Sequence, residues 1–182
     1  MNKAEDVVVA RLEAWGFRCE LFTKAELRAG KTPDRRVYRE QEFAFFLEVK
    51  EVAADDWAGG VRNDPRLNRL ASDVHEAVTQ FDAVNPDRQH MNILAFVNND
   101  TMCGALDLNG VLTGNALTDA GESLPIYKRQ AQGRINDERF RIDGYLWFEG
   151  TVPSKMFTNG SDRRHQTSLH KYFDSHFGKN AG

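Results

Sequence analysis

Cysteine is scarce in this sequence: Cys19 and Cys103 are the only two, they lie far apart, and they form no Cys-x-x-Cys pair. A disulfide framework and a cysteine-based zinc site are therefore disfavoured, and both thiols are expected to be reduced. No apolar run approaches the roughly 20 residues that a membrane-spanning helix needs. Residues 1–17 are charged and amphipathic, without the apolar segment and cleavage site of a signal peptide. These absences predict a cytoplasmic protein without a membrane partner.

Nucleotide-binding motifs are absent as well. The sequence contains neither GxxxxGK[ST] nor GxGxxG, so a nucleotide cofactor has no support. The five histidines form no cluster with cysteine. His165, His170 and His176 are too unevenly spaced to share one face of a helix, so we expect no zinc site.

Charge of one sign does not dominate, since the net charge is −3. A chain of 182 residues that is 41% hydrophobic predicts one folded domain over residues 1–182. Residues 128–182 carry more Lys and Arg than Asp and Glu, whereas residues 1–127 show the reverse. A basic final third is typical of contact with a nucleic acid, although an ordinary mixed surface gives the same pattern.

Hydrophobic periodicity divides the chain into helices and strands. Helices are predicted over residues 3–15 and 73–84, the second opened by a capping box of Asp73 and Glu76. Strands are predicted over residues 17–22, 35–38, 42–50, 92–97 and 139–148, a helical turn and loop over 23–32, a loop over 53–70, and a hairpin with an Asn-Gly turn over 105–113. This order predicts an α/β domain around a mixed sheet.

The strand over residues 42–50 is the most informative stretch, because its apolar run FAFFL ends close to Glu48 and Lys50. Side chains alternate across a strand, so these two charges share one face, and a helix is expected to cover the other. Each buried charge costs on the order of several kcal/mol unless it is compensated. If residues 35–38 pair antiparallel with this strand, Asp34 arrives beside Glu48. Two carboxylates at one sheet edge form the oxygen site that Mg²⁺ prefers.

The pattern Pro33-Asp34, thirteen residues, and then Glu48-Val49-Lys50 resembles the signature of the PD-(D/E)xK nuclease superfamily. The resemblance implies a restriction-endonuclease-like or Holliday-junction-resolvase-like core. That core has three layers and a central mixed sheet, in the order helix, three strands, helix, strand. It corresponds to about residues 3–97, and residues 98–182 would form an accessory, β-rich C-terminal extension.

The resemblance also implies a role for each residue of the site. Asp34, Glu48 and the Val49 carbonyl would bind Mg²⁺, with Mn²⁺ as a substitute. Lys50 would orient the attacking water or stabilise the transition state. A glutamate on the first helix corresponds to Glu5, which would add a ligand or reach a second ion. A glutamine on the helix after the motif corresponds to Gln80, which would hold a water or a phosphate.

Each of these residues also has a simpler interpretation. Asp34 is a common turn residue after proline, and Glu48 with Lys50 could form an ion pair on a solvated face. Glu5 has the spacing of a capping box at the start of its helix, and Gln80 lies on the polar flank of its helix. The apolar strand and the spacing of the whole pattern favour the nuclease site.

Basic and aromatic residues supply candidate contacts to a nucleic acid. In the segment 53–70, Trp57 could stack on a base and three arginines could bind phosphates, and the basic final third supplies the others. The candidates are Arg62, Arg66, Arg69, Arg134, Arg139, Arg141, Arg163, Arg164 and Lys171. The alternative is a solvated loop and an ordinary surface.

The function implied by the resemblance is a Mg²⁺-dependent endonuclease that hydrolyses DNA phosphodiester bonds in restriction, repair, recombination or phage-related defence. A homodimer is expected for cleavage of a duplex, and RNA is the alternative substrate. The alternative function is a non-catalytic nucleic-acid-binding or protein-interaction module with the same fold.

Overall fold

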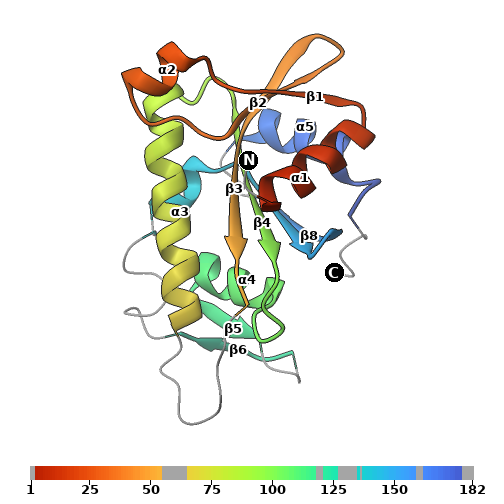
Figure 1. The fold of residues 1–182 in the computed structure, drawn as a ribbon. Helices are drawn as coiled ribbons and strands as arrows, with labels where there is room; N and C mark the ends of the chain where they lie inside the picture. Colours follow the sequence, from red (N-terminus) through yellow and green to blue (C-terminus); the bar gives the residue numbers. More distant parts are fainter. Residues whose placement is uncertain are drawn as a thin grey trace.

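The chain folds around one six-stranded sheet (Figure 1). The computed structural model describes residues 3–54, 65–117, 121–126, 135, 137–158 and 162–177. The helices are α1 (Lys3–Ala14), α2 (Lys24–Ala29), α3 (Pro65–Val84), α4 (Ala105–Thr113) and α5 (Arg163–Phe173), with one 3₁₀ turn, η1 (Glu138–Arg141). The strands are β1 (Phe17–Glu20), β2 (Arg35–Arg39), β3 (Glu42–Val52), β4 (Met91–Asn98), β5 (Asn115–Leu117), β6 (Ser123–Pro125), β7 (Gly144–Glu149) and β8 (Val152–Thr158).

The sheet is mixed, with the strand order β1-β2-β3-β4-β7-β8. β4 is parallel to β3 and to β7, and the other neighbours are antiparallel. The order α1, β1, β2, β3, α3, β4 confirms the predicted succession of helix, three strands, helix and strand, with α2 added between β1 and β2. Pairing of β2 with β3 sets Arg35 opposite Leu47, so the residue before Arg35 comes next to the charged end of β3.

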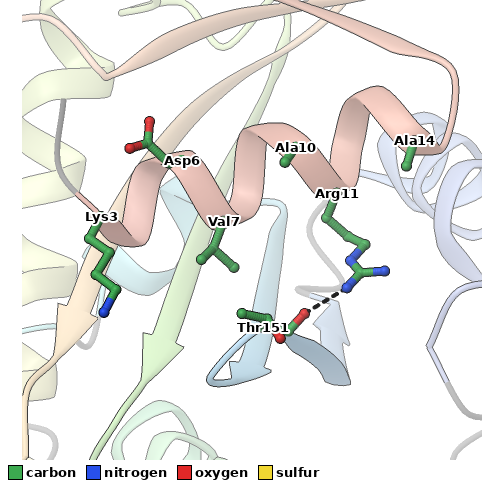
Figure 2. A pocket seen from close by; sticks show the side chains of 7 residues that line it. All are labelled: Lys3, Asp6, Val7, Ala10, Arg11, Ala14 and Thr151. Atoms are coloured by element: carbon green, nitrogen blue, oxygen red, sulfur yellow. Dashed lines mark hydrogen bonds between the residues drawn. The ribbon is translucent and has the colours of Figure 1, made fainter.

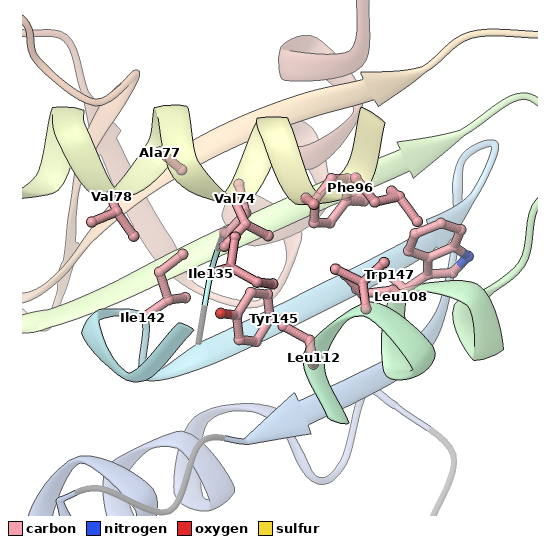
Figure 3. Packing of buried hydrophobic residues seen from close by; sticks show 14 of the residues in the cluster. Val74, Ala77, Val78, Phe96, Leu108, Leu112, Ile135, Ile142, Tyr145 and Trp147 are labelled. Carbon is pink, nitrogen blue, oxygen red and sulfur yellow. The ribbon is translucent and has the colours of Figure 1, made fainter. Parts of the chain in front are cut away.

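Helices cover both faces of the sheet, and a separate hydrophobic core lies on each face. Phe45 and Leu47 of β3 pack with α1 and α5 on one face. On the other face, α3 and α4 pack around Phe96 and Trp147 (Figure 3). A helix therefore covers the face of β3 opposite to Glu48, as the alternation along the strand predicts.

Helix α3 starts earlier than the sequence pattern suggests. The expected start at Asp73 is wrong, and so is the expected loop over residues 65–70, because the helix begins at Pro65. Residues 53–54 belong to no helix or strand, and the rest of the expected loop, residues 55–64, lies outside the described residues. Proline suits the first turn of a helix, where its missing N–H would have no intrahelical partner. Leu70 extends the buried stripe toward this end. Asp73 therefore lies inside the helix, and the predicted capping box with Glu76 is wrong.

Residues 105–113 form helix α4 and not the predicted hairpin. The pair Asn109-Gly110 resembles a turn, but Val111 and its apolar neighbours in α4 pack against α3. The glycine serves close packing, because a β-carbon at position 110 would lie 2.9 Å from Cδ1 of Ile126. Burial on a neighbouring helix overrides the local turn preference here.

The C-terminal part is not an accessory extension. β7 and β8 complete the central sheet, and α5 packs on the same face as α1 through Leu169 and Phe173. β5 and β6 form a separate two-stranded sheet. The strand predicted over residues 139–148 begins at Gly144, because residues 138–141 form η1. No helix within the described ranges has the length and apolar character needed to cross a bilayer.

Asp143, just before β7, connects three elements although its side chain is only 1% exposed. Its Oδ1 accepts a hydrogen bond from Nη2 of Arg88 at 3.0 Å and lies 2.9 Å from Nδ1 of His165 on α5. Its Oδ2 accepts a hydrogen bond from the Asn92 N–H of β4 at 2.9 Å. One buried carboxylate at the start of β7 thus joins α5 to β4.

We expect Asp143→Ala to lower the free energy of unfolding by about 3 to 5 kcal/mol, because the change leaves buried polar partners without their acceptor. Urea unfolding followed by circular dichroism measures the loss. Asp82→Ala is the matched control, since its ion pair with Arg141 is partly exposed and should contribute less than about 1 kcal/mol. Equal losses in the two variants would contradict the role given to Asp143.

Candidate active site

Asp34 and Glu48 meet where the chain enters β2 beside β3. The Asp34 N–H donates to Oε2 of Glu48 at 3.1 Å. The Val49 N–H donates to Oδ2 of Asp34 at 2.8 Å. Each carboxylate therefore accepts a hydrogen bond from the backbone of the opposite segment. This reciprocal pair of bonds, which we call the carboxylate lock, holds the two acids together.

The Val49 carbonyl faces the same side as the carboxylate lock. In an extended strand the N–H and C=O of one residue point to the same side, and the Val49 N–H points to Asp34. The pairing of β2 with β3 ends at Arg35 opposite Leu47, so Val49 lies beyond the paired part of this edge. Its carbonyl can therefore offer a third oxygen beside the two carboxylates.

Lys50 brings a positive charge to this face of the sheet. Its Nζ lies 3.0 Å from Oε1 of Glu48 and 2.9 Å from Oε2 of Glu76 on α3. The Glu48 side chain is 3% exposed, whereas that of Glu76 is 57% exposed. The lysine thus bridges a buried carboxylate on the strand and a mostly solvated one on the helix.

Gln80, one turn after Glu76 on α3, contacts the site from the helix side. Its amide donates to the Thr32 carbonyl at 3.3 Å and to the Glu48 carboxylate. Within the described part of the chain, its buried Oε1 has no hydrogen-bond partner. A buried amide oxygen of this kind can accept a hydrogen bond from a water or a ligand.

The carboxylate lock carries negative charge that its surroundings compensate only in part. Burial, and then the charge of Asp34, raise the pKa of Glu48 to about 7 despite Lys50. Burial also raises the pKa of Asp34, although the Val49 N–H and Lys50 lower it. Burial lowers the pKa of Lys50, but its hydrogen bonds to Glu76 and Glu48 outweigh burial and raise it. The amine is therefore charged at neutral pH, and the acids favour one more cation.

This donor set fits a hard divalent cation. Proteins hold Mg²⁺ with one or two carboxylates, and water and phosphate complete its shell. Asp34 and Glu48 supply two carboxylates, with the Val49 carbonyl beside them. No group of three or more His, Cys, Asp and Glu side chains in the described ranges is arranged to hold a metal. With two carboxylates and one carbonyl as its protein ligands, an ion here would leave several positions for water and substrate.

Glu5 of α1 has a different partner from the one that the resemblance implies. Its Oε1 lies 2.7 Å from Nη2 of Arg35, and both side chains are largely buried. Arg35 pairs with Leu47 in the ladder, so it lies on the face covered by α1, whereas Glu48 shares the α3 face with Phe46. In this arrangement Glu5 compensates a buried arginine.

Asp73 and Glu76 on α3 belong to the site, although their spacing in the sequence predicts a helix cap. Burial raises the pKa of Asp73 to about 6, and the charges of Lys50 and Arg69 oppose this rise. Its Oδ2 is buried without a hydrogen-bond partner among the described residues. The signal in the sequence was the spacing of Asp73, Glu76 and Gln80, which sets three polar side chains on one side of a helix.

The candidate contacts to a nucleic acid that the structure describes lie in different parts of the molecule. Outside the described residues lie Trp57, Arg62 and Arg134. Arg69 lies beside the site, and its Nη2 donates to the Glu51 carbonyl at 3.4 Å. Burial raises the pKa of the Cys103 thiol, just before α4, and the nearby charge of Arg66 opposes this rise, so Arg66 lies toward that helix.

The basic residues of the final third lie in other parts of the molecule. Arg139 donates to the Leu112 carbonyl, and Arg141 pairs with Asp82 at 2.6 Å. The other candidates are exposed on α5: Arg163, Arg164 and Lys171. Since α5 covers the face of the sheet opposite to α3, these residues are not gathered around Lys50.

A cavity of about 370 Å³ lies along α1, apart from the carboxylate lock (Figure 2). Val7, Ala10 and Ala14 contribute apolar surface to its lining. Arg11 donates to the Thr151 carbonyl at 3.0 Å, beside the cavity. The lining contains no residue of the candidate site, so the cavity and the carboxylate lock are separate features.

The metal-free protein should lose stability as the pH rises, because folding raises the pKa values of Glu48 and Asp34. For Glu48 this stability is complete below the ordinary value of 4.5 and is lost as the pH rises through about 7. Between about pH 5 and about pH 8 we expect a loss on the order of 1 to 3 kcal/mol from this source. Millimolar Mg²⁺ should restore most of it at the higher pH.

Urea unfolding at several pH values, with and without Mg²⁺, measures this effect. Glu48→Gln should flatten the dependence, because the titrating group is gone. Glu42→Gln is the matched control, since Glu42 is an exposed acid at the other end of β3 and should leave the profile as in the wild type. Parallel profiles for the wild type and Glu48→Gln would refute the assignment.

Glu5→Gln should destabilise the fold without weakening metal binding. Loss of the charged partner of buried Arg35 should lower the free energy of unfolding by about 1 to 3 kcal/mol. Because Glu5 contacts Arg35 on the opposite face from Glu48, the Mn²⁺ affinity measured by calorimetry should not change. A clear drop in that affinity would show instead that Glu5 is a ligand.

Comparison with known proteins identified no relative of this chain. Searches of protein-family models, of curated proteins and of solved structures found no match. The chemistry of the site is therefore inferred from its own contacts, charges and burial.

Proposed function

We propose that this protein is a Mg²⁺-dependent phosphodiesterase that cleaves DNA and is built on a restriction-endonuclease-like core. The observation that carries the proposal is the carboxylate lock, which joins Asp34 to Glu48 with Lys50 on the same face. The motif that resembles the PD-(D/E)xK superfamily supports it, and so does the order α1, β1, β2, β3, α3, β4.

The two carboxylates and the Val49 carbonyl would hold the ion. Their fit to Mg²⁺ rests on the incompletely compensated charge of Asp34 and Glu48, which the raised pKa values express. A bound Mg²⁺ would lower the pKa of a water at the site and would place positive charge beside the scissile phosphate.

The side chains around the lock supply orientation and charge. The Lys50 amine is a charged donor that can bind a phosphate oxygen or orient the attacking water, and it stabilises negative charge that develops on the phosphate. Gln80 fixes the Glu48 carboxylate and offers its buried Oε1 to a water. Because backbone N–H groups hold Asp34 and Glu48, both oxygen donors are oriented before substrate arrives.

Basic side chains near α3 can contact the phosphates of a nucleic acid. The hydrogen bond from Lys50 lowers the pKa of Glu76, and the charge of Lys31 adds a smaller lowering. Burial raises the pKa of Asp73, and the charge of Arg69 is among those that oppose this rise. Positive side chains therefore accompany the acids of this helix near Lys50, and contacts of this kind position a phosphate chain. We propose DNA as the substrate and a homodimer as the form that cuts both strands of a duplex.

A cleavage assay with plasmid DNA and short single strands tests the proposal. The wild type should cut in Mg²⁺ or Mn²⁺ and should stop in EDTA. Asp34→Asn and Lys50→Ala should each slow cleavage by at least about 100-fold, because they remove an oxygen ligand and the charge that stabilises the transition state. Gel electrophoresis under single-turnover conditions measures the rates.

Glu42→Gln and Lys155→Ala are the controls, since both residues are exposed and lie away from the lock. Both should cleave like the wild type. DNA binding without cleavage under any metal would reject the enzyme and support the non-catalytic module. Cleavage of RNA alone, in parallel reactions, would correct the substrate.

A further inference from the structure

The Lys50 amine contacts two carboxylates, one buried and one mostly exposed. Glu48 is buried, and its Oε2 is held by the Asp34 N–H. Glu76 is 57% exposed on α3, so its side chain retains more freedom to follow the amine. The two contacts of Nζ are almost equal in length, at 3.0 Å to Glu48 and 2.9 Å to Glu76.

The lysine competes with any cation that binds the carboxylate lock. Its amine lies on Oε1 of Glu48, one of the oxygens that a metal would use. A divalent ion bound by Asp34 and Glu48 would repel the Lys50 ammonium group. It would also weaken the attraction between that group and the Glu48 carboxylate. Unless another anion compensates the charge of Lys50, the loss of its contact with Glu48 makes metal binding less favourable.

We propose that Glu76 is a positioning residue that draws Lys50 away from Glu48 and so opens the lock to the metal. The inference rests on the proposed function, because it assumes a metal at Asp34 and Glu48. Glu76 touches neither of them in the described contacts and acts through the lysine. Its contact also leaves the amine between β3 and α3, in contact with a carboxylate of each.

The position of Glu76 on α3 supports this role. Gln80 lies four residues later on the same helix and donates to Glu48, so one helix contacts the lysine and the carboxylate separately. The exposed ion pair by itself contributes little to stability. Its effect should therefore appear in metal affinity and not in the unfolding free energy.

If Glu76 acted only through its negative charge near the metal, the result would differ from that expected for a residue that positions Lys50. Removing any acid near the lock weakens cation binding through space, whether or not Lys50 is present. Positioning requires the lysine, because without it no amine competes for Glu48. The two explanations are separated by a double-mutant cycle with Lys50→Met, which keeps the apolar stem and removes the charge.

The experiment is calorimetric titration of Mn²⁺ into the wild type, Glu76→Ala, Lys50→Met and the double variant, without DNA. We expect Glu76→Ala to weaken Mn²⁺ binding about tenfold when Lys50 is present and less than about twofold when it is absent. Lys50→Met alone should tighten binding. Glu76→Gln, which keeps an acceptor but no charge, should fall between the wild type and Glu76→Ala. Asp82→Asn, another acid on α3, should have no effect.

Each outcome decides one of the two proposals. Equal weakening with and without Lys50, or no weakening at all, overturns the positioning role and leaves the metal site intact. Absence of Mn²⁺ binding in the wild type, with no difference from Asp34→Asn, overturns the metal site and the positioning role together. Far-UV circular dichroism of each variant confirms that a loss of affinity is not a loss of fold.

Discussion

Two hydrogen bonds from the backbone hold together the two acids of the candidate site. The Asp34 N–H reaches Glu48, and the Val49 N–H reaches Asp34, at the point where the chain enters β2. β3 continues past the start of β2 and thereby leaves an edge of the sheet on which two carboxylates and a carbonyl converge. Because one donor lies in β3 and the other directly precedes β2, the sheet orients both acids.

The concentration of buried acid at this edge has an energetic cost that the rest of the structure limits. Lys50 and Gln80 both contact Glu48, yet the pKa of Glu48 still rises to about 7. A protein that kept this arrangement only for stability would gain by replacing one of the acids. Strongly perturbed acids around a charged amine are typical of sites that bind a cation or perform proton transfer.

The sequence predicts the parts of the fold that depend on short-range pattern. Alternation along β3 was enough to assign the faces of Glu48 and Leu47, and the predicted pairing of β2 with β3 brought Asp34 to the site. Longer-range packing explains the failures. The turn signal in α4 yields to burial against α3, and the C-terminal strands join the central sheet by pairing across the chain. No local pattern showed that Arg35 would recruit Glu5.

The most direct test of the carboxylate lock is anomalous diffraction from crystals of the protein soaked in Mn²⁺. We expect a strong anomalous peak about 2 to 2.3 Å from oxygens of Asp34 and Glu48 and from the Val49 carbonyl. A peak at other residues, or none beside these two acids when Mn²⁺ is in excess, would contradict it.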